Sequence, residues 1–184
     1  ARETGSLLVN HPGVDKIAFT GSTPVGKRIA REVAGSRKSL TLELGGKAAN
    51  IVFDDAPVDQ AVEGIVNGIF FNQGQVCCAG SRLLVQESVA EAPCELPERG
   101  YWFAPTVFTD VSTAHTIARE EIFGPVLSVL TFRTPAEAVA KANNTPYGLS
   151  AGIWTEKGSR ILWMADQLRA GVVWANTFNR FDPT

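Results

Sequence analysis

The sequence predicts an α/β fold built on a mostly parallel sheet. Along its 184 residues the spacing of apolar side chains switches repeatedly between the strand period of two and the helix period of 3.6. Strand-like runs therefore alternate with amphipathic helical runs, an order typical of parallel sheets. The composition, 45% hydrophobic and 20% charged residues, is that of a globular chain rather than a disordered one.

Short apolar runs bounded by glycine, proline or polar residues predict the strands. They occupy residues 16–20, 39–44, 48–53, 83–86, 102–108, 126–132, 150–154 and 172–176. Glycine is frequent between them because a sharp turn needs backbone freedom. The glycine pair Gly45-Gly46, for example, separates the second strand from the third.

Amphipathic runs predict the helices between these strands. The first begins at Thr23-Pro24, with Thr23 as the cap, and continues to about residue 35. A second runs from residue 58 and ends by Gly74. A capping box at 134–137 starts a helix that reaches about residue 143, and another covers 158–170 with Gly171 as its stop.

Charge and composition exclude several function classes. The net charge of −2 argues against a protein that binds nucleic acid through a strong basic field. No apolar run approaches the roughly 20 residues that cross a bilayer, and no secretory leader is recognisable at the start. Three cysteines without a CxxC pair suit neither a disulfide framework nor a zinc site, so we expect no metal and a cytoplasmic location.

Adjacent thiols at Cys77 and Cys78 lie in a turn of small and polar residues directly after a helix. Such a turn leaves room for a substrate, which favours a nucleophilic thiolate. The alternative is that both cysteines are small buried hydrophobic residues, the commoner fate of a free cysteine.

Two other sites could carry chemistry. Glu43 ends an apolar strand, where partial loss of water would raise its pKa and make it a general base. The alternative is a solvated carboxylate or one paired with Lys47.

The turn 21–26 has two glycines and leads into a helix whose start can hold a phosphate. The alternative is an ordinary tight turn followed by a capped helix. Gly46-Lys47 is no phosphate-binding loop, since Thr41 replaces the required first glycine.

In their order along the chain, several motifs resemble those of the NAD(P)-dependent aldehyde dehydrogenase family. The resemblance spans residues 11–183, through FTGSTPVGKRI, LELGGK, FFNQGQVCCAGSR, GYWFAPTVF, EEIFGPV, NNTPYGLSAGIWT and VVWANTFNRFDP. It implies a Rossmann-type parallel part at 1–46 that binds NAD or NADP, and an α/β catalytic part at 47–184. It also implies an aldehyde as substrate and a homo-oligomer, without nucleic acid or membrane as partner.

The resemblance assigns a role to individual residues. Cys77 matches the nucleophile, which adds to the aldehyde and, after hydride transfer to NAD(P)⁺, is left as a thioester. Glu43 matches the base that activates water to hydrolyse it. The cofactor side would include Gly21, Ser22, Gly26 and Leu44 from the first part, with Glu121 at the nicotinamide ribose and Phe123 beside it. Phe71, Asn176 and Phe178 are candidate lining residues of the aldehyde pocket.

The chain also departs from the family pattern. It lacks a counterpart of the family's N-terminal portion, which supplies an oxyanion-binding Asn and an adenosine-binding Lys. Residues 87–100, with two prolines and four glutamates, read by composition as a linker and, against the family, as a deletion junction. The sequence thus leaves two hypotheses, a working aldehyde dehydrogenase and an incomplete remnant of one. We further expect exposed apolar sheet edges and poor solubility.

Overall fold

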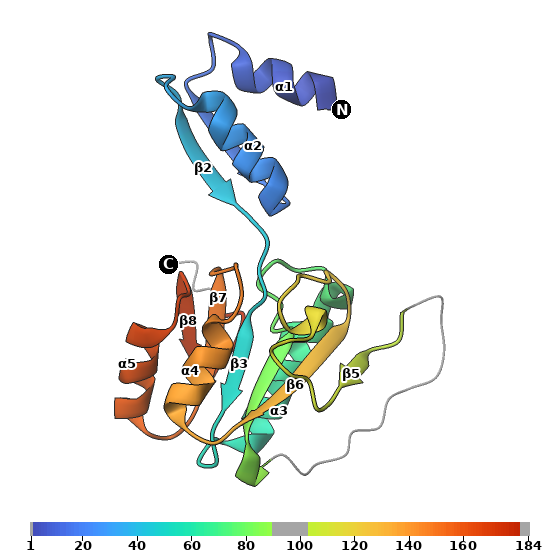
Figure 1. Cartoon of the computed structure of the whole chain (residues 1–184), viewed down its shortest axis with the longest axis vertical. Helices are drawn as coiled ribbons and strands as arrows, with labels where there is room; N and C mark the ends of the chain where they lie inside the picture. Colours follow the sequence, from blue (N-terminus) through green and yellow to red (C-terminus); the bar gives the residue numbers. More distant parts are fainter. Residues whose placement is uncertain (1, 90–102, 181–184) are drawn as a thin grey trace. The chain divides into compact units, whose positions relative to one another are not determined.

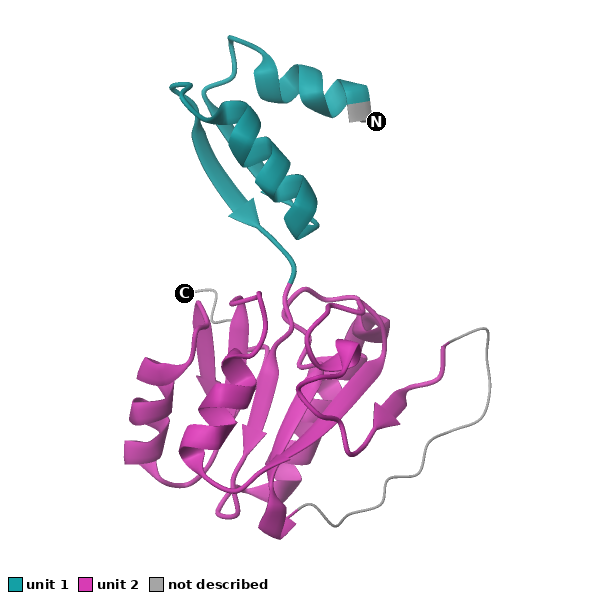
Figure 2. Cartoon of the chain, viewed as in Figure 1, with its two compact units in different colours: residues 1–45 teal, residues 46–184 magenta. Residues whose placement is uncertain are grey.

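The computed structural model describes residues 2–89 and 103–180. The chain divides into two compact units, Ala1–Gly45 and Gly46–Thr184, coloured separately in Figure 2. Each unit has its own apolar core and is described by itself.

Unit 1 is a two-stranded parallel sheet with two helices. Its elements are α1 (Arg2–Asn10), β1 (Lys16–Thr20), α2 (Thr23–Val33) and β2 (Ser39–Glu43). The register pairs Lys16 with Ser39 and Thr20 with Glu43, so β1 and β2 end side by side. Its small core joins Val9 of α1 to Ile29 and Val33 of α2. The sequence did not predict α1, because among residues 3–10 of this helix Val9 alone is buried and gives no periodic signal.

The start of α2 differs from the prediction in its cap. The capping position is Ser22 rather than Thr23, and no side chain bonds to the first amides of the helix. The first N–H groups of a helix have no partner inside it, so this end of α2 keeps donors for an external acceptor. The helix ends at Val33, two residues before the predicted limit, and Gly35 turns the chain with a φ of 76°.

Unit 2 holds the larger sheet, in which all pairs of the described strands are parallel, as predicted. The strand order is β5-β6-β4-β3-β7-β8. The bounds are β3 (Ala49–Val52), β4 (Arg82–Gln86), β5 (Thr106–Phe108), β6 (Val126–Phe132), β7 (Ser150–Trp154) and β8 (Val172–Ala175). The α/β fold class with parallel sheets is therefore confirmed.

Helices cover both faces of this sheet (Figure 1). α4 (Pro135–Asn143) and α5 (Gly158–Gln167) lie on the near face, and α3 (Val58–Phe70) lies on the far one. The two faces form separate cores because successive strand residues point to opposite sides. On the near face Ile51, Leu84 and Leu130 pack against α4 and α5, whereas Ala61, Ile65 and Ile69 of α3 pack against the far face with Trp154.

Local differences from the predicted bounds have simple causes. Half of the predicted capping box of α4 is present: the Thr134 side chain accepts a bond from the Glu137 N–H, whereas the Glu137 carboxylate accepts the N–H of Arg133 rather than that of Thr134. α5 ends at Gln167 rather than 170, because Leu168 takes an extended conformation. The predicted strand 102–108 is a strand only from Thr106, and its first residue lies outside the described part. Short one-turn helices at Phe71–Gly74, Glu87–Val89 and Thr116–Ala118 complete the described elements.

The edges of the larger sheet expose apolar side chains, as we expected. On β5 the exposed residues are Val107 and Phe108, and on β8 the exposed residue is Val172. A parallel edge with apolar side chains is a site for pairing or association.

Candidate active site

The turn that carries the two thiols is backbone-strained. After α3 ends, Asn72, Gln73 and Gly74 adopt left-handed conformations, with φ of 49°, 58° and 71°. Non-glycine residues in this region cost free energy, and such residues are concentrated at functional sites. The Asn72 side-chain amide donates to the Gln75 carbonyl at 3.1 Å and helps to hold the turn.

The adjacent cysteines have different surroundings. Cys77 is half-buried, whereas Cys78 is buried and its Sγ lies 3.1 Å from Asn179 Oδ1, to which the thiol donates. Burial raises the pKa of the Cys78 thiol, and the neighbouring Cys77 raises it further. The reading of a small buried hydrophobic residue therefore suits Cys78, and Cys77 is the thiol that a reagent can reach.

Three segments far apart in the sequence meet beside Cys77. The Gly46 N–H donates to Glu121 Oε1 at 3.0 Å, and a side chain at Gly46 would overlap the Cys77 carbonyl oxygen. At Gly74 a side chain would likewise overlap the backbone of Gly124. Unit 2 thus brings the predicted residues Cys77 and Glu121 together around a close backbone approach that only glycine permits.

Phe123 follows Glu121 in the same loop. It takes a left-handed φ of 58° and its ring is 50% exposed. About half of this aromatic residue is therefore accessible to solvent.

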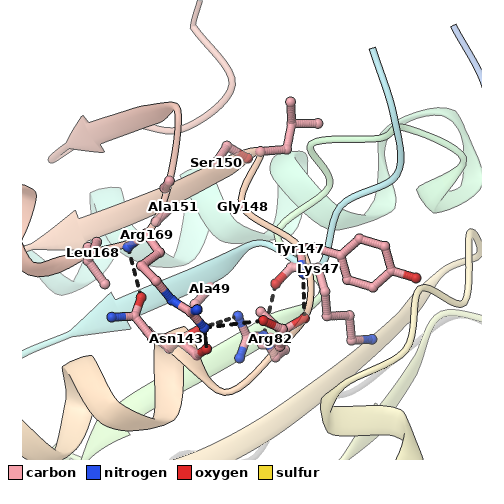
Figure 3. Close-up of a pocket in the computed structure, with 14 residues that line it drawn as sticks. Lys47, Ala49, Arg82, Asn143, Tyr147, Gly148, Ser150, Ala151, Leu168 and Arg169 are labelled. Carbon is pink, nitrogen blue, oxygen red and sulfur yellow. Dashed lines mark hydrogen bonds between the residues drawn. The ribbon is translucent and has the colours of Figure 1, made fainter. Parts of the chain in front are cut away.

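Sequence reasoning missed two buried cations next to this cluster. Lys47 and Arg82 are each 2% exposed (Figure 3). The Arg82 guanidinium donates to the carbonyl oxygens of Lys47, Lys141 and Ala142 at 2.9, 3.0 and 2.7 Å. The ammonium of Lys47, in contrast, has no hydrogen-bond partner among the described residues.

These environments lower both pKa values. Burial lowers the pKa of Lys47 to about 8; the charge of Arg82 lowers it further, and that of Glu121 opposes the change. Burial alone lowers the pKa of Arg82 to about 10. Lysine is rarely buried without a partner, so nothing in the motif LELGGK indicated this position of Lys47.

Two of the hollows in unit 2 are lined by residues near the candidate site. The pocket in Figure 3, bordered by Lys47, Arg82 and Tyr147, has a volume of about 20 Å³, enough for one water molecule but too small for an organic ligand. A groove of about 500 Å³ lies between α3 and the segment after β8. Its lining includes the three residues predicted for an aldehyde pocket, Phe71, Asn176 and Phe178, together with Asn179.

Unit 1 gathers its predicted residues at the carboxyl end of its two strands. The Gly21 N–H donates to the Glu43 carbonyl at 3.0 Å, and Ser22 occupies the position before the helix without a side-chain bond to it. A side chain at Gly26 would overlap the Leu44 side chain, so α2 lies directly against this strand end. The carboxyl end of parallel strands is where ligands of α/β sheets bind.

One expectation for Glu43 is not met by its own unit. The alternating burial of β2 leaves the Glu43 side chain exposed within unit 1. The residues of unit 1 therefore do not supply the partial desolvation that we predicted for this strand-end carboxylate.

The described residues contain no group of three His, Cys, Asp or Glu side chains arranged to hold a metal ion. No helix in residues 2–89 and 103–180 has the length and apolar content to span a bilayer.

Comparisons with known proteins agree with the motifs. The profile of the aldehyde dehydrogenase family matches residues 1–96 and again 92–184. Betaine aldehyde dehydrogenase of Rhizobium etli is 40% identical over 234 aligned positions, covering 97% of this chain and 48% of that protein. The chain spans about half the length of the curated relatives it matches.

Solved structures show the same relationship. An NAD-dependent aldehyde dehydrogenase from Sinorhizobium meliloti has a TM-score of 0.90 and 37% identity, over 97% of this chain and 46% of that one. The aldehyde dehydrogenase of Bacillus cereus in its NAD⁺ complex has a TM-score of 0.87 and 36% identity, over 97% and 47%. The sequence motifs, the fold and the family profile together show that this chain belongs to the aldehyde dehydrogenase family.

Proposed function

We propose that this chain oxidises an aldehyde to a carboxylic acid with NAD⁺ or NADP⁺, through a covalent intermediate on Cys77. The observation that carries the proposal is the reachable Cys77 thiol beside Gly46 and Glu121, in a chain of this family. A cysteine protease or hydrolase is disfavoured, because neither histidine lies in a recognisable nucleophile context.

The residues present fit a dinucleotide cofactor. The uncapped start of α2, next to Gly21 and Ser22, offers backbone N–H groups to a diphosphate. The Leu44 side chain packs directly against Gly26, so the first turn of α2 lies close to the end of β2. From the resemblance we assign Glu121 as the acceptor of ribose hydroxyl bonds and Phe123 as the aromatic beside it. The bound cofactor would accept the hydride of the reaction.

The chemistry of the protein's own residues then follows. The Cys77 thiolate adds to the carbonyl carbon and forms a thiohemiacetal. When that carbon loses its hydride to the cofactor, a thioester on Cys77 remains. We assign Glu43 as the base that takes a proton from water, which attacks the thioester, releases the acid and restores the thiolate. The groove lined by Phe71, Asn176 and Phe178 is our candidate for the aldehyde pocket.

A second candidate is a catalytically incompetent remnant of the family. The length of the chain fits this candidate without favouring it: the chain covers 48% of the Rhizobium etli relative. In addition, their alignment has 234 positions against 184 residues, so at least 50 positions of the relative have no counterpart inside this chain. The two profile matches meet at residues 92–96, which supports our assignment of 87–100 as a deletion junction.

The proposal also includes a function for each part of the chain, an oligomeric state and a cellular location. We assign cofactor binding to residues 1–46 and catalysis to 47–184. The family resemblance supports a homo-oligomer, and the free cysteines support a cytoplasmic location.

The test is NADH formation, followed at 340 nm, by the purified chain with a panel of aldehydes and either NAD⁺ or NADP⁺. We expect Cys77→Ala to abolish turnover and the matched thiol control Cys78→Ala to retain it. Glu43→Gln should accumulate an acyl adduct on Cys77, visible as a mass increase of the intact protein. A folded wild-type chain that forms neither NADH nor an adduct would refute the proposal in favour of the remnant.

A further inference from the structure

The buried ammonium of Lys47 calls for a role beyond packing. A buried charge is normally paired, because removing it from water without a partner is costly. Lys47 is 2% exposed, and its Nζ has no hydrogen-bond partner among the described residues. A methionine would fill the same space without that cost.

The charged and titratable groups around Lys47 come from four segments. Arg82 lies on β4, and Tyr147 and Arg169 border the same small pocket (Figure 3). The Arg82 guanidinium donates only to neutral carbonyl oxygens, so it remains a second buried cation. Glu121, in the loop before β6, is the carboxylate whose charge acts on Lys47.

Glu121 is held on one side by the backbone. Its Oε1 accepts the N–H of Gly46, the residue directly before Lys47. Two adjacent residues of one segment therefore act on the same carboxylate: Gly46 through a hydrogen bond and Lys47 through its charge.

We propose that Lys47 is a positioning residue for Glu121: its buried ammonium, together with the Gly46 N–H, holds this carboxylate in the orientation that accepts the hydroxyl groups of the cofactor ribose. The inference rests on the proposed function, which assigns the cofactor to Glu121. It extends that function to Lys47, a side chain that the family resemblance assigns no role.

The proposal makes cofactor affinity depend on pH. Because the pKa of Lys47 is about 8, the ammonium is charged at pH 7 and largely neutral at pH 9. Above pH 8 Glu121 loses this neighbouring positive charge. Affinity for NAD⁺ should therefore fall as pH rises through 8, although NAD⁺ itself keeps its charge in this range.

The experiment measures the dissociation constant of NAD⁺ by calorimetry from pH 6.5 to 9.5, with the whole chain. For wild type we expect a rise of about tenfold between pH 7 and pH 9, equivalent to about 1.4 kcal/mol. Lys47→Met should bind about tenfold more weakly at pH 7 and show no pH dependence. Lys47→Arg, whose charge does not titrate here, should restore binding at pH 7 and keep it at pH 9.

Glu121→Gln provides the coupling control. If Lys47 acts through Glu121, the double variant should bind no more weakly than Glu121→Gln alone. Equal affinity and equal pH profiles of wild type and Lys47→Met would overturn the inference, as would independent losses that add in the double variant.

A second measurement needs no cofactor. The pKa of Lys47 can be followed by NMR of ¹³Cε-labelled lysine in the free protein, with assignment by the absence of the signal in Lys47→Arg. Glu121→Gln should lower the pKa of Lys47 below 8, because the opposing charge is lost. An unchanged pKa would refute the pairing. If wild type does not bind NAD⁺, the result counts against the proposed function. The NMR pKa of Lys47 in the free protein would then still test its pairing with Glu121.

Discussion

Replacing Lys47 by methionine should make the protein more stable at neutral pH, although it removes a charged residue from a motif of the family. Burial without a partner lowers the pKa of Lys47 from 10.5 to about 8. At about 1.4 kcal/mol per pH unit, the charged side chain destabilises the fold by about 3 kcal/mol at pH 7. Methionine keeps the length and apolar packing of the side chain and removes this term.

The difference in the free energy of unfolding between wild type and Lys47→Met should depend on pH. Between pH 8 and pH 10.5 the unfolded chain binds a proton that the folded chain does not, so the free energy of unfolding of wild type rises across this window. Lys47→Met lacks that contribution. The advantage of the variant should be largest below pH 8 and should shrink steadily above it.

Urea unfolding followed by tryptophan fluorescence at pH 7, 8.5 and 9.5 measures the difference. Lys27→Met, at an exposed position of α2, is the matched control and should change the free energy of unfolding by less than about 0.5 kcal/mol. The reasoning is refuted if Lys47→Met is less stable than wild type at pH 7, or if the difference between them is the same at pH 7 and pH 9.5.

Three further predictions concern the surrounding residues. Gly46→Ala should lower the free energy of unfolding by about 1–3 kcal/mol and slow alkylation of Cys77, because the added methyl group overlaps the Cys77 carbonyl oxygen. Arg82→Met should destabilise the fold by about 3 kcal/mol in urea unfolding, opposite in sign to Lys47→Met, since three carbonyl oxygens in and beside the core each lose a charged donor. In a Cys94→Ser background at pH 8, iodoacetamide should modify Cys77 at least about tenfold faster than Cys78, as read by peptide mass spectrometry, because burial raises the pKa of the Cys78 thiol.

Each of these has a contrary result. An unchanged stability of Gly46→Ala would show that the backbone beside Cys77 relaxes freely. A stabilised Arg82→Met would mean that the charge penalty at this position exceeds the value of its three hydrogen bonds. Equal alkylation of the two thiols would contradict the difference in their burial.

The order of elements was predictable because its signals are local. The capping box at Thr134 and Glu137 and the apolar spacing of α3 each act within a few residues of chain. Parallel pairing also follows from strands that alternate with helices. The bounds that failed, at β5 and at the end of α5, depend on where tertiary contacts stop rather than on residue preference.

The site was predictable in part. Cys77 and Glu121 were named from motifs, and the structure adds that the Gly46 backbone lies between them. Lys47, Arg82 and the bond from Cys78 to Asn179 could not be found in the same way. They join residues 35 or more positions apart, and lysine and arginine at a strand start usually indicate a solvated surface.

The parallel pairing of β4 with β6 depends little on the length of the segment that joins them along the chain. The residues from Gln86 to Thr106 connect β4 to β5 along the chain. The Rhizobium etli relative has at least 50 more positions within the aligned region. Closing a shorter connection lowers the entropic cost by only about 1 kcal/mol. The register, with Arg82 opposite Ser128 and Gln86 opposite Phe132, is set by strand contacts and core packing. Residues 87–100 are therefore a natural place to cut the chain, and two separately produced halves of unit 2 should reassemble by recognising each other's strands.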